Sequence, residues 1–465
     1  MSAPWLAVPR SLQGSAAASR ATSASALRSP ASSSFSPLTI CGACRRTRSR
    51  TRMAHRSYSS STGAAFPQVP AAGVTALASR RLISVSGPDA AKYLQGVITS
   101  SMVRLQTQTG QDDGTGAAPP QSGFYSAFLS AQGRVLHDVF VYRDTLGVGK
   151  DAGSGGDASA SFLIEVDADA AATLAKHIRR YKLRAKFDVR LLAADELTVW
   201  HGWGLPAGAP LPSVGADPDP GLIAHHDTRA PGLGWRFVAP AARTASSLPA
   251  QIELNVADEA AYRVRRYLLG VAEGQREMLH NQALPLESNM DIMGGIDFHK
   301  GCYVGQELTI RTRHRGVVRK RILPCLVYGA DDEQPRSLAV DAHGTTSPGL
   351  ADTIPAETSI GRVGKRGRSA GKWLSGVGNL GLALCRLETM TDVALPGEAV
   401  AAAATAAATF DPTSEFVMKF VEGSENDGEG GSGGEGEADA SAPTTAVKIK
   451  AFVPDWLRQG LAPQD

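Results

Sequence analysis

Two β-like runs joined by a short turn limit the fold of this 465-residue chain more than any other feature. Residues 123–129 and 135–142 are rich in aromatic and β-branched side chains, and the turn 130–133 reads Ser-Ala-Gln-Gly. Runs this close pair as an antiparallel hairpin, because a parallel pair needs a crossover of a dozen or more residues. The hairpin therefore argues against a doubly wound parallel sheet.

Strand-like and helix-like segments alternate around this hairpin. Residues 81–86, 162–166 and 186–192 predict strands. A helix is expected to open at Gly87-Pro88-Asp89, because proline suits the first turn and an acid suits its positive end. A second helix is expected over residues 168–181. Mixed elements with hairpins predict an α+β fold.

The character of the chain changes after residue 318. Short β-like runs separated by Gly and Pro predict a small β-barrel domain over residues 319–465. The segment 423–445 inside it is acidic, lacks aromatic and branched apolar residues, and is expected to be a disordered insertion. The β-like runs of this domain are residues 321–328, 359–365, 378–386, 415–421 and 447–452.

Charge is divided unevenly along the chain. Residues 1–58 contain nine arginines and no Lys, Asp or Glu, which is typical of a mitochondrial transit peptide, with 59–72 as a linker. A disordered basic tail and a nuclear signal are the alternatives.

The remaining 39 basic and 45 acidic residues give a net charge of −6, which argues against nucleic acid as a partner. The apolar stretch 399–410 is too short to span a membrane.

The run Lys-Gly-Cys-Tyr-Val-Gly-Gln-Glu, residues 300–307, concentrates the side chains that can do chemistry. Cys302 follows Lys300, and residues 303–313 are predicted to form a helix. A nearby cation and the positive end of a helix favour the thiolate, the reactive and metal-binding form of cysteine. Gln306 and Glu307 can cap free amides or position a ligand. We therefore predict Cys302 as the reactive thiol, with Lys300 and Glu307 as catalytic neighbours.

The other cysteines have a simpler interpretation. Cys325 and Cys385 lie in apolar β-like runs and are expected to be small buried hydrophobes, while Cys41 and Cys44 fall in the predicted transit peptide. A single thiolate does not hold an iron–sulfur cluster, which usually takes four Cys or His ligands. If Cys302 binds a cluster, it does so transiently, with the other ligands supplied by a partner or a small molecule.

Residues 300–307, followed by Arg-Thr-Arg-His-Arg-Gly at 311–316, resemble the signature of the YgfZ family, relatives of the glycine-cleavage T-protein, an aminomethyltransferase. Weaker similarity covers residues 72–318 and the trailing β segment. The resemblance implies a T-protein-like folate-binding fold, with two intertwined subdomains over residues 73–318. It also implies a transferase-related iron–sulfur cluster assembly factor of the mitochondrial matrix.

The same resemblance implies partners and ligands. The partners are A-type (Isca-like) iron–sulfur scaffold proteins and recipient [4Fe–4S] enzymes of the matrix. The implied cofactors are tetrahydrofolate and a transient iron–sulfur cluster bound at Cys302. The candidate folate or motif contacts are Asp138, Arg263, Tyr303 and Gln306.

The chain departs from the T-protein at two places. The hairpin has His137-Asp138 where the enzyme has two acids, and Asp227–Trp235 replaces the enzyme's Gly-Tyr-Thr-Gly-Glu loop. These losses argue against aminomethyl transfer. Three hypotheses stay open at this point: an assembly factor centred on Cys302, a folate-dependent one-carbon transferase, and a non-catalytic folate- or flavin-binding module with a structural cysteine.

Overall fold

The computed structural model describes residues 66–67, 69–106, 122–149, 161–205, 219, 221–248, 254–339, 349–364, 367–394, 410–421 and 444–462. The predictions for the transit peptide and for the Cys41–Cys44 pair lie outside these residues, as does most of the acidic insertion. Thr444 and Thr445, the last two residues assigned to that insertion, instead begin a barrel strand.

The predicted hairpin is present and forms the edge of a five-stranded sheet in the order β3-β4-β5-β2-β6. Strands β3 and β4 pair antiparallel along their whole length, with an irregularity between Phe128 and Leu129. Every residue of β3 is buried, which explains its unbroken apolar sequence. The strands of this sheet are β2 (Arg80–Ser86), β3 (Gly123–Leu129), β4 (Val135–Arg143), β5 (Ser161–Asp167) and β6 (Asp188–Leu191).

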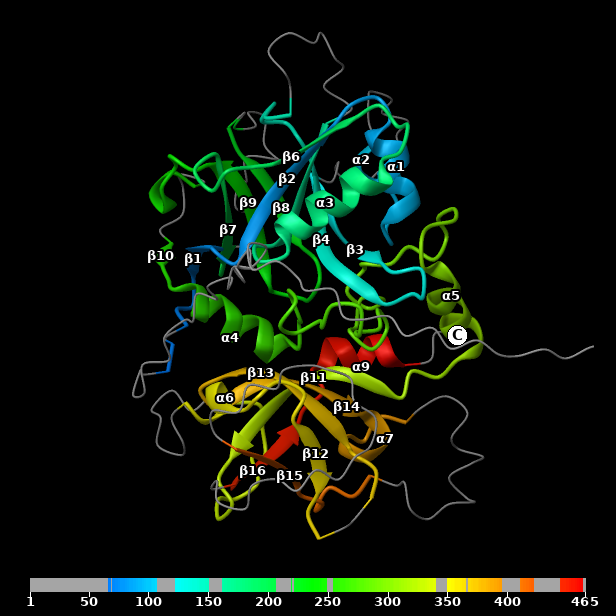
Figure 1. Ribbon diagram of the computed structural model, residues 1–465. Helices are drawn as coiled ribbons and strands as arrows, with labels where there is room; N and C mark the ends of the chain where they lie inside the picture. Colours follow the sequence, from blue (N-terminus) through cyan, green and yellow to red (C-terminus); the bar gives the residue numbers. More distant parts are fainter. Residues whose placement is uncertain are drawn as a thin grey trace, which may run out of the picture. The chain divides into compact units, whose positions relative to one another are not determined.

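Three helices lie on one face of this sheet, and the longer two, α1 and α3, are seen beside it in Figure 1. Helix α1 begins at Ala90, directly after the predicted Gly-Pro-Asp start. Leu94 of α1 and Leu174 and Ile178 of α3 are fully buried in the core between helices and sheet. The helices on this side are α1 (Ala90–Val97), α2 (Val103–Gln106) and α3 (Ala171–Tyr181).

A second five-stranded sheet has the order β10-β1-β7-β9-β8. Helix α4 (Glu259–Leu269) begins where the Asp258 carboxylate accepts a hydrogen bond from the Ala260 amide. One continuous apolar core joins both sheets, α4 and the barrel. The strands of this sheet are β1 (Gly73–Ala76), β7 (Leu197–Trp203), β8 (Ile223–Asp227), β9 (Gly234–Pro240) and β10 (Asn255–Val256), followed along the chain after β9 by the short helix η2 (Ala245–Ser247).

The C-terminal part is a closed barrel in the order β11-β14-β13-β12-β15-β16. The prediction missed β13, because its Gly371, Ser375 and Gly376 weaken the β pattern. The Trp456 indole donates a hydrogen bond to the Leu269 carbonyl at 3.0 Å and so ties the barrel domain to α4. The barrel strands are β11 (Lys320–Tyr328), β12 (Ser359–Arg362), β13 (Gly371–Val377), β14 (Leu380–Arg386), β15 (Phe416–Val421) and β16 (Thr444–Ala451).

The remaining helices are short. None of the helices in the described ranges is long and apolar enough to cross a membrane. The mixture of antiparallel sheets, covering helices and a terminal barrel confirms the α+β prediction. The remaining helices are α5 (Gln306–Arg315), α6 (Leu350–Thr353), α7 (Leu387–Met390) and α9 (Asp455–Leu461).

Candidate functional site

The loop 296–305, called here the Cys302 loop, presents the Cys302 thiol at the surface immediately before α5. Backbone hydrogen bonds hold the loop on both sides of the thiol. The Asp297 amide donates to a carbonyl of the turn after α1 at 3.0 Å, and the Val304 amide donates to a carbonyl of α1 at 3.1 Å. The sequence therefore places an exposed thiol on a loop that is fixed to the first sheet domain.

Lys300 anchors this loop from inside. Its ammonium donates hydrogen bonds to the carbonyl oxygens of Ile98 and Ser100, at 2.7 and 2.9 Å, and lies 5.0 Å from the Tyr303 ring centroid. Burial lowers the pKa of Lys300 to about 8, with only partial opposition from the Asp297 carboxylate. The geometry thus gives Lys300 a positioning role, whereas the sequence had placed it beside the thiol as a free cation.

Helix α5 begins later than predicted. The expected range was 303–313, but the helix runs from Gln306 to Arg315, because Gly305 is its N-cap and adopts a left-handed φ of 80°. Cys302 therefore precedes the cap by three residues. The positive end of the helix is strongest in its first turn, and Cys302 lies outside that turn.

The three other motif residues have different surroundings. The Gln306 side-chain oxygen accepts a hydrogen bond from the Tyr303 amide at 3.1 Å, which closes the turn between the thiol and the helix. Tyr303 is buried, and burial raises the pKa of its phenol to about 12. Glu307 is exposed in the first turn of α5. The structure thus places five of the candidate residues together: Lys300, Cys302, Tyr303, Gln306 and Glu307.

Asp138 lies elsewhere, in a buried ionic network between the two sheets that we call the charge cluster. Its carboxylate accepts hydrogen bonds from the Gly274 amide at 3.1 Å and from Arg80 at 3.4 Å. Arg236 pairs with Glu165 and Glu273, and it contacts Asp227 at 3.2 Å. The members of the charge cluster are Arg80, Asp138, Glu165, Asp227, Arg229, Arg236, Tyr262, Arg266, Glu273 and Glu277.

Burial and pairing act against each other within the cluster. Burial raises the Asp227 pKa, but the Arg229 and Arg236 guanidiniums outweigh it and hold that pKa below its ordinary value. For Asp138, burial dominates and raises the pKa, with Arg80 opposing only in part. Asp138 therefore keeps a proton more readily than Asp227 does.

Sequence reasoning missed most of this cluster. Its members are scattered over the chain from Arg80 to Glu277 and share no local pattern. From the sequence, Arg263 of α4 is predicted as a folate contact. Arg266, three residues further along the same helix, enters the cluster, where it pairs with Glu277 at 2.7 Å. Arg263 is only half-buried and acts instead on Asp352 of α6, where burial raises the pKa of the carboxyl and the Gly378 amide and Arg263 oppose that rise in part.

Metal-binding groups are sparse in the part of the chain that the structure describes. No group of three or more His, Cys, Asp or Glu side chains there is arranged to hold a metal ion. Cys325 and Cys385 are both fully buried in the barrel, with sulfur atoms 3.8 Å apart, as their apolar surroundings predicted. Cys302 is thus the one exposed thiol among the described cysteines.

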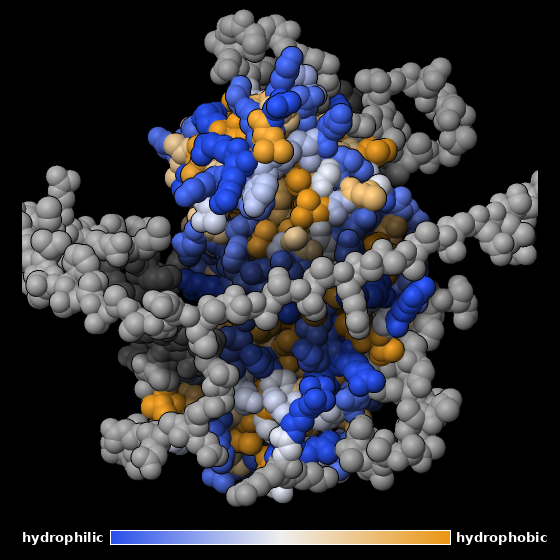
Figure 2. Space-filling view, turned by 45° about the vertical axis from the view of Figure 1, so that its right-hand side comes forward, coloured by the Kyte–Doolittle hydropathy of each residue, from blue (hydrophilic) through white to orange (hydrophobic). Residues whose placement is uncertain are grey.

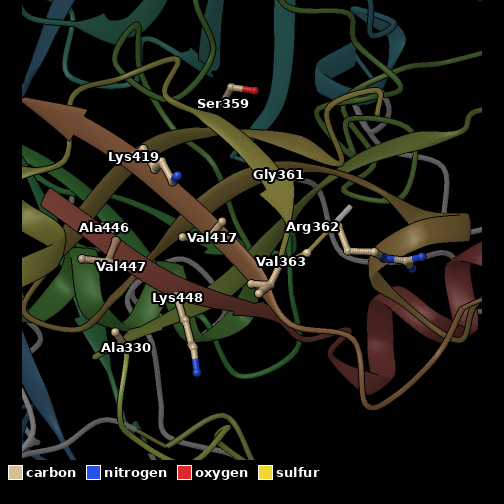
Figure 3. A pocket seen from close by; sticks show the side chains of 11 residues that line it. Ala330, Ser359, Gly361, Arg362, Val363, Val417, Lys419, Ala446, Val447 and Lys448 are labelled. Carbon is tan, nitrogen blue, oxygen red and sulfur yellow. The ribbon is translucent and has the colours of Figure 1, made fainter. Parts of the chain in front are cut away.

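A cavity of about 730 Å³ lies on the barrel beside β12, β15 and β16. Figure 3 shows that Val363 and Val417 line it together with Arg362, Lys419 and Lys448. None of the candidate residues lines it. The smaller cavity, of about 180 Å³, borders α5 and is considered below.

Known proteins provide three comparisons. Residues 319–413 match the family model described as the CAF17 C-terminal β-barrel domain. The chain is 49% identical to the "Iron-sulfur cluster assembly factor IBA57 homolog, mitochondrial" of Chaetomium globosum, over 88% of this chain and 89% of that protein. It is 52% identical to the protein of the same name from Pyricularia oryzae, over 84% of this chain and 87% of that one.

A solved structure supports the fold. The chain superimposes on the glycine cleavage system aminomethyltransferase T of Bartonella henselae with a TM-score of 0.50 and 14% identity. The superposition covers 83% of this chain and 87% of that one. At this identity the likeness bears on the fold alone, and it confirms the predicted T-protein-like architecture.

Proposed function

Because this chain belongs to the family of the IBA57 mitochondrial iron–sulfur cluster assembly factors, we propose that Cys302 supplies one ligand to a cluster shared with a partner protein. The observation that carries the proposal is an exposed thiol on an anchored loop, while no group of three or more His, Cys, Asp or Glu side chains among the described residues is arranged to hold a metal ion. Since a cluster usually needs four ligands, the remaining ligands come from outside this chain.

The partner in this proposal is an A-type iron–sulfur scaffold protein of the mitochondrial matrix, and the recipients are matrix [4Fe–4S] enzymes. The Cys302 loop suits a shared ligand, because Lys300 and the backbone bonds fix the thiol before any partner arrives. A pre-positioned ligand loses little conformational entropy on binding. In this proposal the cluster is the cargo and the scaffold is the partner. The chain then binds and passes on a cluster, which needs no catalytic turnover.

A spectroscopic titration tests this proposal. Full-length chain carrying Cys41→Ser and Cys44→Ser is mixed with cluster-loaded A-type scaffold, and the visible absorption and circular dichroism of the cluster are recorded. We expect a saturable spectral change that Cys302→Ser abolishes and that the Cys385→Ala control retains. An unchanged titration with the Cys302→Ser variant would contradict the proposed ligand role.

Tetrahydrofolate binding remains a separate proposal that rests on the family resemblance. The charge cluster fits a pterin ring poorly, because Glu165, Asp227 and Glu273, the carboxylates that could accept its N–H donors, are already paired with arginines. Saturable binding of tetrahydrofolate that Asp138→Asn weakens would establish the cofactor. Formation of methylenetetrahydrofolate from an aminomethyl donor would establish the transferase alternative, and the lost Gly-Tyr-Thr-Gly-Glu loop leads us to expect no turnover.

A further inference from the structure

The smaller cavity, called here the α5 cavity, lies between α5 and two flanking chain segments. Its wall opposite the helix is held to the barrel, because the Glu287 carbonyl accepts a hydrogen bond from the Ile322 amide at 2.8 Å and the Leu286 carbonyl accepts one from Arg321. The cavity is therefore preformed rather than a gap beside a loose loop. Its lining residues are 284–287, Leu308, Thr309, Thr312 and 317–319.

The lining of the α5 cavity is mostly aliphatic, with one unused polar group. Thr309 is only 1% exposed, and its hydroxyl has no hydrogen-bond partner among the described residues. The neighbouring Thr312 hydroxyl, in contrast, donates to the Leu308 carbonyl at 2.8 Å. Buried hydroxyls in folded proteins are normally satisfied, so the Thr309 hydroxyl is available to a group that enters the cavity.

The volume and opening of the cavity define the size of that occupant. An apolar cavity of roughly 150 Å³ holds a benzene ring, so about 180 Å³ accommodates one Leu, Met or Phe side chain. Val317 at the rim is 42% exposed, which leaves the cavity open to a group arriving from solvent. On the face shown in Figure 2, hydrophobic patches are divided by hydrophilic surface.

The rim of the cavity is positively charged. Arg311 and Arg315 follow the lining residues Leu308 and Thr312 by three positions and are therefore their neighbours on the helix surface. Both arginines and Arg319 are exposed, and no carboxylate of the described residues lies within ion-pair distance of any of the three. This rim complements negative charge on the group that fills the cavity.

We propose that the α5 cavity receives one apolar side chain of an acidic protein segment, whose carboxylates pair with Arg311, Arg315 and Arg319. This inference rests on the proposed function, since the segment belongs to the partner that shares a cluster with Cys302. Gly305 to Thr312 spans only about 10 Å at the helical rise of 1.5 Å per residue. Cys302 lies three residues before Gly305, which adds at most about 10 Å. A single partner surface of ordinary size, about 800 Å² on each side, therefore reaches the thiol and the cavity together.

The test measures the affinity of the full-length Cys41→Ser, Cys44→Ser chain for the A-type scaffold protein, with and without its cluster. Val317→Trp should fill the cavity mouth and weaken binding at least tenfold in both cases. Arg311→Glu with Arg315→Glu should weaken binding similarly and flatten its dependence on salt. The matched charge control, Lys176→Glu with Arg184→Glu on exposed positions near α3, should bind normally. Melting temperatures verify that each variant is folded.

The outcomes separate this inference from the proposed function. Normal affinity of either cavity variant, Val317→Trp or the double arginine variant, overturns the cavity proposal, even if Cys302→Ser abolishes the change in the cluster spectrum. Weaker binding by both cavity variants supports it, even if the Cys302→Ser variant gives the same spectral titration as the parent and the ligand proposal fails. Sedimentation of the chain alone provides one further check, since self-association that Val317→Trp abolishes would assign the cavity to a second copy and overturn the proposal. If Val317→Trp does not fold, Thr312→Met serves as the filling variant.

Discussion

Gly305 of the Cys302 loop lies directly against Gly133 in the turn of the β3–β4 hairpin. A Cβ atom on Gly305 would lie 2.3 Å from the Ser130 carbonyl oxygen, and one on Gly133 would lie 2.9 Å from the Gly305 carbonyl oxygen. Both glycines also have a φ of 80°. The hairpin that limits the fold thus also supports the loop that carries Cys302.

Gly305→Ala should therefore loosen the loop as well as the fold. Left-handed φ and the close carbonyl together should cost about 1–3 kcal/mol in the free energy of unfolding. Gly301→Ala is the matched control, because a Cβ there meets nothing within 4 Å, and its effect should stay within about 0.5 kcal/mol. Chemical denaturation measures both values, and equal effects would contradict the role given to Gly305.

Local patterns predicted the elements of the fold that depend on neighbouring residues. The hairpin runs 123–129 and 135–142 coincide with β3 and β4 to within one residue, because apolar runs and turn residues are short-range signals. Strand β13 was missed, since its glycines are used for close packing inside the barrel: a Cβ on Gly376 would lie 2.6 Å from the Ala351 carbonyl oxygen.

In the candidate site, too, local features could be predicted from the sequence and long-range contacts could not. The motif 300–307 is contiguous, so the position of Cys302 near the start of a helix followed from the sequence, although that helix begins three residues later than predicted. The partners of Lys300 did not, because the carbonyls of Ile98 and Ser100 lie about 200 residues away along the chain. The charge cluster likewise joins arginines and acids by tertiary packing alone, and the sequence pointed to it only through Asp138 and through the departure of Asp227–Trp235 from the T-protein pattern.

Removing one member of the charge cluster should be far costlier than breaking a surface pair. Arg236→Met leaves Glu165, Asp227 and Glu273 short of a buried cation, and such a loss typically costs about 3–5 kcal/mol. Arg243→Met breaks a partly exposed pair with Asp219 and should cost no more than about 1 kcal/mol. Urea unfolding compares the two, and similar losses would show that the cluster does not depend on Arg236.

Acid should destabilise the protein partly through a buried histidine. Burial lowers the pKa of His137 to about 3, with smaller contributions from His280 and His177. Since the unfolded chain takes up the proton near pH 6.5, the stability due to this group is complete above that pH and falls as the pH drops toward 3. His137→Phe should therefore flatten the decline in unfolding free energy between pH 6.5 and 4.

The matched control for the pH experiment is His226→Phe, because His226 is exposed. That variant should keep the pH dependence of the parent protein. The His137 nitrogen Nδ1 has no hydrogen-bond partner among the described residues, so the phenylalanine removes no bond of that atom. A parallel shift of the whole curve for His137→Phe, with its slope intact, would mean that other groups govern the acid limb.

Lys300 offers a test of positioning that is separate from ligation. Lys300→Met removes the ammonium from the Ile98 and Ser100 carbonyls while keeping most of the aliphatic stem, so the Cys302 loop should open more often. We expect faster amide exchange at Val304 and at least threefold weaker cluster-dependent binding of the scaffold, with the thiol still available to iodoacetamide. Lys92→Met, at an exposed position of α1, should change none of these. Unaltered exchange at Val304 in Lys300→Met would show that the backbone bonds alone hold the loop.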